Sequence, residues 1–303
     1  MKDKLGLAIH GGAGTMSVID MTPELRDEYH SALKYVLDES FKILVSGGSS
    51  LDSTEHAVVL LENSPLFNAG KGSVFSSNGT NELDATIMDG ATLNAGALAV
   101  VKRIKNPIKA ARLVMEKSKH VLLMGEGAEE FSKKMNVEFV SPDYFHTERR
   151  WNLYLKRKEE KKSAEEKFGT VGAVARDKDG NLAAATSSGG TSNKCIGRVG
   201  DSAIIGAGTY ADNTTCAVSG TGTGEYFIRL SIAYHISALM AYNGMSVTQA
   251  SDYVINKKLA ELGGEGGVIV IDKDCNTALL FNSEGMYRGW INGNGQPEVR
   301  IFD

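Results

Sequence analysis

Apolar residues recur with helical or strand spacing through the first half of the chain. Leucine and aromatic residues return every three or four positions over residues 23–46 and stop at Gly47-Gly48, which predicts an amphipathic helix. A second apolar stripe predicts a helix over about residues 53–63. The other elements expected in this half are strands at 5–10, 83–88 and 95–101 and helices near 107–117 and 125–135.

The second half has a different texture, rich in small and β-branched residues. Residues 170–175 and 182–187 are expected to be buried strands joined by a turn. A long helix is expected to follow Thr221-Gly222 and to run to about residue 242. Another helix is expected at 247–262, and strands at 267–271 and 277–281. Strand pairs and helix pairs together predict an α+β fold, two antiparallel sheets sandwiched between helices, in a single domain 1–303.

Charged residues crowd the segment between these two halves. Thirteen of the twenty residues in 148–167 are Lys, Arg, Asp or Glu, and the bases and acids come in alternating blocks. Such a pattern is typical of a solvated linker or of a surface helix with i,i+4 pairs. An arm that binds nucleic acid is the alternative interpretation. We therefore expect a charged linker over about residues 148–168.

Composition and charge exclude several function classes. The net charge of −4 gives no footprint for nucleic acid or for an anionic membrane. The most apolar stretch, residues 226–242, contains Arg229 and His235 and is better suited to a buried helix than to a membrane span. Three widely spaced cysteines and no secretory signal favour the cytoplasm. The scattered histidines offer no zinc site.

The junction Gly169-Thr170 is a candidate for unusual chemistry. A threonine hydroxyl is a weak nucleophile unless a base lies within hydrogen-bond reach. A threonine at a chain N-terminus has its own α-amine as that base, with a reference pKa of about 7.7–8.0. For Thr170 this requires cleavage of the preceding bond, where Gly169 can adopt a strained geometry. From the local pattern alone, however, Thr170 is more simply read as an ordinary strand residue.

Several motifs together resemble one family along essentially the whole chain. Residues 168–177 (Phe-Gly-Thr-Val-Gly-Ala-Val-Ala-Arg-Asp) look like the start of the β-subunit of plant-type L-asparaginases, also called isoaspartyl peptidases. Further matching segments are residues 10–14, 65–70, 82–85, 185–190, 197–202, 206–211, 219–225 and 281–288. The resemblance implies an N-terminal-nucleophile (Ntn) hydrolase fold, a four-layer αββα sandwich. It also implies self-cleavage into an α-subunit, residues 1–169, and a β-subunit, residues 170–303.

The resemblance assigns catalytic roles to residues of the second half. It makes Thr170 the nucleophile, and it places Ser188 where the family usually has a second threonine whose hydroxyl bonds the nucleophile. Thr221 and Gly222 correspond to the oxyanion hole, a hydroxyl and a backbone N–H at the expected start of a helix. The alternative interpretations are an ordinary Ser at a strand end and a glycine-rich helix entry that serves packing alone.

Substrate-binding roles follow from the same resemblance. It assigns Arg198 to the substrate α-carboxylate and Asp201 to the α-amine, and both residue types suit these partners. Without the resemblance, this pair would be read as a surface salt bridge. Gly224 resembles a position whose backbone carbonyl contacts the amine, and Asn68 is implied near the active site.

A structural sodium ion is the only bound ion that the resemblance implies, and no cofactor is expected for catalysis. The ion would be held by six backbone carbonyls, those of Leu61, Glu62, Ser64, Phe67, Ala69 and Lys71. Two positions depart from the family pattern. Lys71 stands where an apolar residue is usual, and its ammonium would oppose a nearby cation. Phe168 stands where many members have His, so maturation is expected to be slower here.

The sequence therefore predicts a self-processing amidohydrolase acting on L-asparagine or β-aspartyl dipeptides. The resemblance implies a homodimer of such processed units. Two alternatives stay open. One is a related hydrolase, either a glycosylasparaginase or a threonine endopeptidase of the taspase kind. The other is an uncleaved relative that serves as a binding or structural protein. The sequence does not decide between free asparagine and isoaspartyl peptides.

Overall fold

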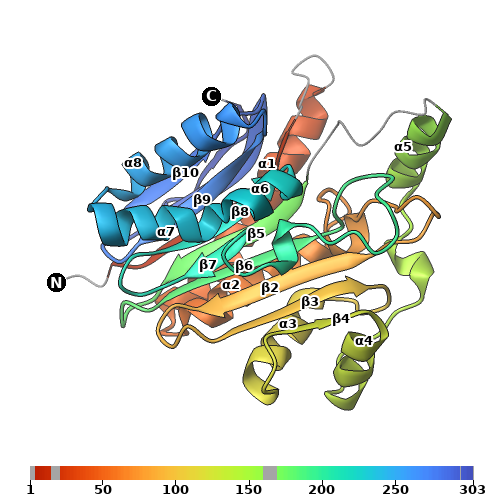
Figure 1. Ribbon diagram of the computed structural model, residues 1–303, viewed down its shortest axis with the longest axis horizontal. Helices are drawn as coiled ribbons and strands as arrows, with labels where there is room; N and C mark the ends of the chain where they lie inside the picture. The colour runs from red at the N-terminus through yellow and green to blue at the C-terminus, as the bar shows by residue number, and fades with distance from the viewer. Residues whose placement is uncertain (1–3, 15–20, 160–168, 294, 303) are drawn as a thin grey trace.

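Two β-sheets of unequal size organise the chain (Figure 1). The computed structural model describes residues 4–14, 21–159, 169–293 and 295–302. The larger sheet has eight strands in the order β12-β11-β1-β5-β6-β2-β3-β4, and the smaller has four in the order β10-β9-β8-β7. The strands are β1 (Gly6–Gly14), β2 (Leu83–Asp89), β3 (Ala95–Val101), β4 (Leu122–Met124), β5 (Thr170–Arg176), β6 (Leu182–Ser188), β7 (Thr209–Ala211), β8 (Cys216–Gly222), β9 (Gly266–Asp272), β10 (Thr277–Phe281), β11 (Gly285–Asn292) and β12 (Glu298–Arg300).

The larger sheet interleaves the two halves of the sequence. β1, from the first half, pairs antiparallel with β11 on one side and with β5 on the other. β6 in turn pairs with β5 and with β2, which again belongs to the first half. The early strand β1 therefore lies among strands that follow residue 169, and β5, which begins at Thr170, lies in the middle of the sheet.

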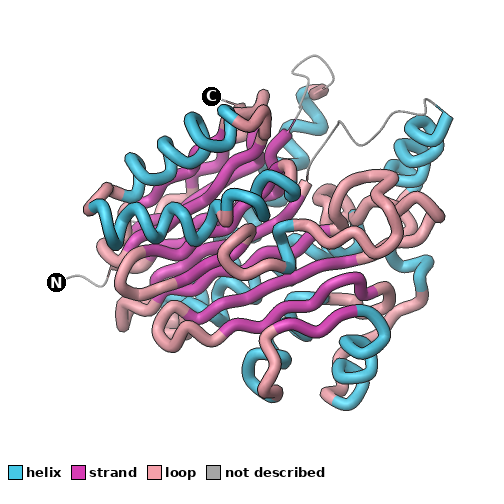
Figure 2. The backbone as a smooth tube through the Cα atoms, viewed as in Figure 1, coloured by secondary structure: helices cyan, strands magenta, loops and turns pink. Residues whose placement is uncertain are grey.

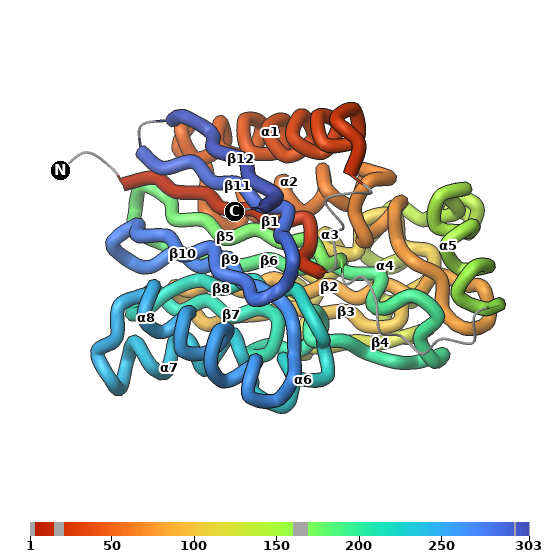
Figure 3. The backbone as a smooth tube through the Cα atoms, turned by 90° about the horizontal axis from the view of Figure 1, so that it is seen from above, coloured from red at the N-terminus to blue at the C-terminus, as the bar shows by residue number. Residues whose placement is uncertain are grey.

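Helices cover the outer faces of the sheets. The longer helical elements are α1 (Pro23–Val45), α2 (Ser50–Asn63), α3 (Pro107–Lys117), α4 (Gly125–Lys134), α5 (Glu148–Glu159), α6 (Gly224–Leu230), α7 (Ile232–Asn243) and α8 (Val247–Asp252), which continues into a π-helix (Tyr253–Leu259). α2 packs on β5 and β6, whereas α7 packs on β8. Figure 3 shows α1 along one side of the molecule and α6–α8 along the other, with strands between them. The inner faces of the sheets meet in a separate apolar cluster that includes Ala8, Val174 and Ile269.

Most of the elements expected in the first half are confirmed. α1 begins after Thr22, whose hydroxyl accepts a hydrogen bond from the Leu25 N–H. α2 begins three residues earlier than expected because Ser49 and Asp52 form a capping box. The charged segment begins with α5, and the expected linker over residues 160–168 lies outside the described residues. No helix in the described part of the chain is long and apolar enough to cross a membrane.

Three expectations about the second half and the sheets are wrong. The single helix expected to reach residue 242 is two helices, because Ser231 adopts a left-handed conformation (φ 48°) between α6 and α7. Thr221 and Gly222 end strand β8 instead of opening a helix, since both pair with β9. The sheets are not wholly antiparallel, because β4 pairs in parallel with β3. As Figure 2 shows, strands also occupy stretches for which none was expected, among them β8 and β11.

Candidate active site

Thr170 and Ser188 face each other at the ends of two paired strands. They are direct cross-strand partners of β5 and β6, and both are nearly inaccessible to solvent. The Thr170 hydroxyl donates a 3.0 Å hydrogen bond to Ser188 Oγ. The Ser188 hydroxyl in turn lies 3.4 Å from the Gly169 carbonyl oxygen. Ser188 therefore contacts both residues of the Gly169–Thr170 bond, whereas the resemblance had implied only its contact with Thr170.

Backbone from the first half of the chain closes around Gly169. A Cβ atom added at Gly12 would lie 2.8 Å from Gly169 Cα, and one added at Gly169 would lie 2.8 Å from Asn68 Cβ. Gly12 also has a φ of +116°, a conformation that a side chain would strain. This junction therefore depends on glycine on both sides of the contact.

Asn68 braces the loop that follows β6. Its side-chain amide donates to the Gly190 carbonyl at 2.7 Å and accepts from the Val74 N–H at 2.9 Å. Its own carbonyl accepts from the Gly189 N–H. Asn68 lies beside Gly169, near the site as expected, but its side chain is engaged with the backbone.

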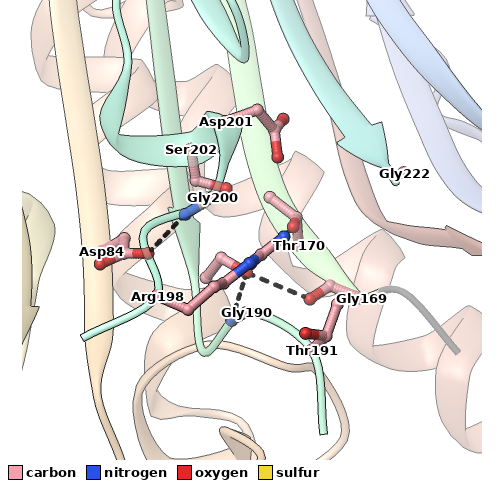
Figure 4. A pocket seen from close by; sticks show the side chains of 11 residues that line it. Asp84, Gly169, Thr170, Gly190, Thr191, Arg198, Gly200, Asp201, Ser202 and Gly222 are labelled. Carbon is pink, nitrogen blue, oxygen red and sulfur yellow. Dashed lines mark hydrogen bonds between the residues drawn. The ribbon is translucent and has the colours of Figure 1, made fainter. Parts of the chain in front are cut away.

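Eleven residues line a narrow pocket in front of Thr170 (Figure 4). They are Asp84, Gly169, Thr170, Ser188, Gly190, Thr191, Arg198, Gly200, Asp201, Ser202 and Gly222. Six of the candidate residues named from the sequence are thus brought to one place: Gly169, Thr170, Ser188, Arg198, Asp201 and Gly222. Thr221 is completely buried beside this pocket, and its hydroxyl accepts a hydrogen bond from the Ala13 N–H at 3.2 Å.

Opposite charges face one another on one wall of the pocket. Arg198 forms two hydrogen bonds of 3.0 Å with the carboxylate of Glu225, the second residue of α6. Asp201 is 4% exposed, and its Oδ2 atom has no hydrogen-bond partner among the described residues. Burial raises the pKa of Asp201 to about 7, although Arg198 acts in the opposite direction. A Cβ atom added at Gly224 would lie 2.9 Å from Asp201 Oδ1, so Gly224 also adjoins this wall.

A buried histidine lies directly behind the pocket. His10 Nε2 is 2.9 Å from Ser219 Oγ, and Ser219 Oγ is 2.7 Å from Thr186 Oγ1. The Thr209 hydroxyl donates to Thr186 Oγ1 at 2.6 Å, which extends this row between the two sheets. Burial lowers the pKa of His10 to about 3, and the adjacent backbone of Thr170 offsets only part of that effect. The imidazole is therefore neutral and belongs to a structural network.

Sequence reasoning did not assign roles to several residues of this site. Asp84 lies within residues 82–85, a segment that carried the resemblance, yet its residue type alone gave it no function. Glu225 was likewise part of a matching motif, and only the fold shows that it holds Arg198. Gly190, Gly200 and Ser202 reach the pocket through loop geometry, for which the sequence offers no local signal.

Comparison with known proteins places this chain in one class, the asparaginases. The family model described as "Asparaginase" matches residues 3–301, so the chain belongs to that family. A protein of Salmonella typhimurium named isoaspartyl peptidase is 50% identical over 99% of both chains. The isoaspartyl peptidase of Escherichia coli is also 50% identical, over 99% of this chain and 96% of its own. A probable isoaspartyl peptidase/L-asparaginase of Arabidopsis thaliana is 38% identical over 98% of both.

Proposed function

We propose that the chain cleaves itself between Gly169 and Thr170 and then hydrolyses the side-chain amide of L-asparagine and of β-aspartyl dipeptides, releasing L-aspartate. The names of these relatives, isoaspartyl peptidase and isoaspartyl peptidase/L-asparaginase, support this substrate class. The observation that carries the proposal is the 3.0 Å contact between the hydroxyls of Thr170 and Ser188, beside the Gly169 carbonyl. The cut would leave fragments 1–169 and 170–303 of one domain, arranged as a four-layer αββα sandwich.

The proposed reaction uses Thr170 twice. In the precursor, its hydroxyl oxygen attacks the Gly169 carbonyl, and the C–N bond breaks as an ester forms, which frees the Thr170 α-amine. Water then hydrolyses this ester to give the Gly169 carboxylate and the free Thr170 hydroxyl. In the mature enzyme, that amine accepts the hydroxyl proton while the oxygen attacks the substrate side-chain carbonyl. The oxyanion that forms would be stabilised by the Thr221 hydroxyl and the Gly222 N–H. The intermediate then collapses with cleavage of the amide C–N bond, and ammonia or the amine of the dipeptide's second residue leaves with the proton held by the Thr170 α-amine. Water hydrolyses the remaining ester and releases aspartate.

Recognition of the substrate's aspartyl end is assigned to Arg198, Asp201 and Gly224. The Arg198 guanidinium already pairs with a carboxylate in two hydrogen bonds, which is the geometry that a substrate α-carboxylate would require. The Asp201 oxygen without a partner would accept from the substrate ammonium. Asn68 would keep the loop of Gly190 in place without touching the substrate.

A sodium ion in the loop after α2 belongs to this proposal as a structural group. The carbonyl oxygens of Glu62, Pro65 and Phe67 approach glycine Cα atoms of this loop so closely that a Cβ at Gly70 or Gly72 would collide with them. Backbone carbonyl oxygens are ligands that suit a hard cation. The six expected ligands are the carbonyls of Leu61, Glu62, Ser64, Phe67, Ala69 and Lys71, and the ion would stiffen the loop that carries Asn68.

The sodium assignment is tested by thermal unfolding. Transfer into sodium-free buffer should lower Tm by several degrees, and NaCl should restore it more effectively than LiCl or choline chloride. The Lys71 ammonium lies 5.7 Å from the centroid of the Tyr144 ring. Lys71 would hold the ion through its backbone carbonyl, and its ammonium is directed to this ring. Lys71→Met keeps the carbonyl and should therefore retain the rise of Tm with NaCl. A Tm that is equal with all three salts would refute the site.

Self-cleavage is tested by intact mass and a denaturing gel. Wild-type protein should give fragments 1–169 and 170–303 at neutral pH, whereas Thr170→Ala should stay whole and inactive. A chain that stays intact after prolonged incubation would favour an unprocessed homologue. Activity on glycosylated asparagine alone would favour a glycosylasparaginase, and cleavage within proteins would favour a taspase-like endopeptidase. Size-exclusion chromatography would test the homodimer, and fractionation of cells the cytoplasmic location.

A further inference from the structure

Asp84 shares one row of the larger sheet with the two hydroxyl residues of the site. It is the cross-strand partner of Ser188 in the pairing of β2 with β6, and Ser188 is the partner of Thr170 in the pairing of β6 with β5. The Asp84 side chain is completely buried and lines the pocket (Figure 4). Burial of a carboxylate is costly unless it is hydrogen-bonded or paired with a cation, because burial disfavours the charged form.

The two Asp84 oxygens accept hydrogen bonds from two different segments. Oδ1 accepts from the Val100 N–H at 3.0 Å, and Oδ2 accepts from the Gly200 N–H at 3.4 Å. Both partners are backbone donors, which is the arrangement that an ionised carboxylate requires. Val100 has a φ of +57°, which is rare for a β-branched residue and marks local strain. Gly200 immediately precedes Asp201, so this bond fixes the start of the turn that presents Asp201 to the pocket.

Charges surround Asp84 on all sides of the pocket. Burial raises the pKa of Asp84, and the cations Lys194 and Arg198 act in the opposite direction. Lys194 is itself buried and donates to the Glu82 carbonyl at 2.9 Å. The charge of Arg198 favours the ionised form of Asp201. The charges of Glu225 and Asp84 disfavour that form. The negative charge of Asp84 thus raises the pKa of Asp201, in addition to the larger effect of burial.

We propose that Asp84 is a positioning residue for substrate binding: it holds Asp201 in place through the Gly200 N–H and places a second carboxylate in the same pocket. The inference rests on the proposed function in taking Asp201 as the acceptor of the substrate ammonium. It assigns Asp84 no contact with the reacting atoms. Asp84 therefore acts on binding of the aspartyl end, and Thr170 acts on the chemical step.

The test compares Asp84→Asn with Asp89→Asn in the processed enzyme. Asp89 ends the same strand far from the pocket, where it accepts from the Ala91 N–H and the Thr92 hydroxyl. The side-chain amide that Asp84→Asn introduces has a single acceptor oxygen in place of two, so the bonds to the two N–H groups cannot both be kept. The KM for asparagine and the KI of L-aspartate should therefore rise about 10-fold, and the kcat should stay within about two-fold of wild type. Asp89→Asn should match wild type in all three.

The pH dependence of KI separates this role from simple loop support. In wild type, KI should rise as pH falls through about 7, because Asp201 becomes protonated. In Asp84→Asn, the pKa of Asp201 falls, so this rise should begin at lower pH. The α-amine freed at Thr170 titrates in both proteins and cancels in the comparison. If the KI of Asp84→Asn equals that of wild type, the proposal is refuted. It is also refuted if this KI is raised but begins to rise with falling pH at the same pH as in wild type.

A second variant covers failure of Asp84→Asn to fold or mature. Lys194→Met removes a cation that lowers the pKa of Asp84, so this pKa should rise further and the protonated carboxyl should hold the Gly200 N–H less well. Its KI for L-aspartate should also rise, about five-fold. A wild-type KI in this variant overturns the proposal. If wild-type protein neither cleaves itself nor hydrolyses asparagine, the proposed function fails instead, and the two failures are thereby distinguished.

Discussion

The guanidinium of Arg198 holds the carboxylate of Glu225 in two hydrogen bonds, each 3.0 Å long. The guanidinium of Arg198 therefore already binds a carboxylate of the protein. The α-carboxylate of the proposed substrate would compete for the same N–H donors. Glu225 is more than half exposed, so the pair gains little from burial and can be opened by a competing carboxylate. Glu225 also raises the pKa of Asp201. Both effects oppose binding of the aspartyl end.

Glu225→Gln should accordingly strengthen substrate binding. The KM for asparagine is expected to fall roughly three-fold with little change in kcat, since an exposed pair is worth less than about 1 kcal/mol. Steady-state kinetics measure both values. Glu138→Gln, which opens the exposed pair with Lys105, is the control and should leave them unchanged. A higher KM in Glu225→Gln would mean that Glu225 helps to hold Arg198 in its binding position.

Ser188 should govern both maturation and turnover. Ser188→Ala removes the acceptor of the Thr170 hydroxyl and the donor to the Gly169 carbonyl. Self-cleavage and kcat should each fall about 10-fold or more. Ser188→Thr keeps the hydroxyl and should retain both activities. The time course of fragment formation on a gel gives the first rate. Cleavage by Ser188→Ala at the wild-type rate would remove Ser188 from the mechanism.

The sequence predicts the secondary structure best where the pattern is long and periodic. Residues 107–117 and 125–135 were expected as helices from their spacing, and α3 and α4 occupy them almost to the residue. The break at Ser231 was not predicted, because the apolar pattern continues across it. The structure shows it as a left-handed residue between α6 and α7, next to the smaller sheet. Strand β4 escaped because its three residues are largely exposed and give no alternating pattern.

For the site, the resemblance supplied residue types but not their neighbours. Arg198 and Asp201 were expected at the pocket, and the structure brings both there. Asp84 was not, because its role depends on hydrogen bonds to Val100 and Gly200, which are 16 and 116 positions away along the chain. Such long-range contacts follow from strand register, which a single sequence does not fix.

Two paired threonines provide a matched test of the buried network between the sheets. Thr186 and Thr86 are cross-strand partners, and both are completely buried. The Thr186 hydroxyl bonds with Ser219 and Thr209, whereas the Thr86 hydroxyl has no partner among the described residues. Thr186→Val should lower the free energy of unfolding by about 1–3 kcal/mol, and Thr86→Val should leave it unchanged or raise it. Urea unfolding of both variants gives the comparison, and equal losses would contradict it.

Glu62 should make stability depend on pH. Burial raises the pKa of its carboxyl from 4.5 to about 7, against opposing hydrogen bonds from Ser187, Asn106 and the Ile108 N–H. The contribution of Glu62 to stability is therefore complete below pH 4.5 and is lost as pH rises through 7. At pH 8 the loss is on the order of 3 kcal/mol. Glu62→Gln cannot ionise, so the difference in Tm between it and wild type should shift in its favour from pH 5 to pH 8. A pH-independent difference would contradict this.

The position of β1 among later strands of the larger sheet has a consequence for the cut molecule. β1 lies between β11 and β5, so this strand of the first fragment hydrogen-bonds only to strands of the second. Separating the two fragments would thus require dismantling the sheet. Before the cut, refolding is a first-order event within one chain. After it, refolding becomes an encounter between two molecules, and its yield would fall on dilution. After cleavage, the lifetime of the folded enzyme would therefore depend on how slowly the two fragments dissociate, and no longer on a folding equilibrium.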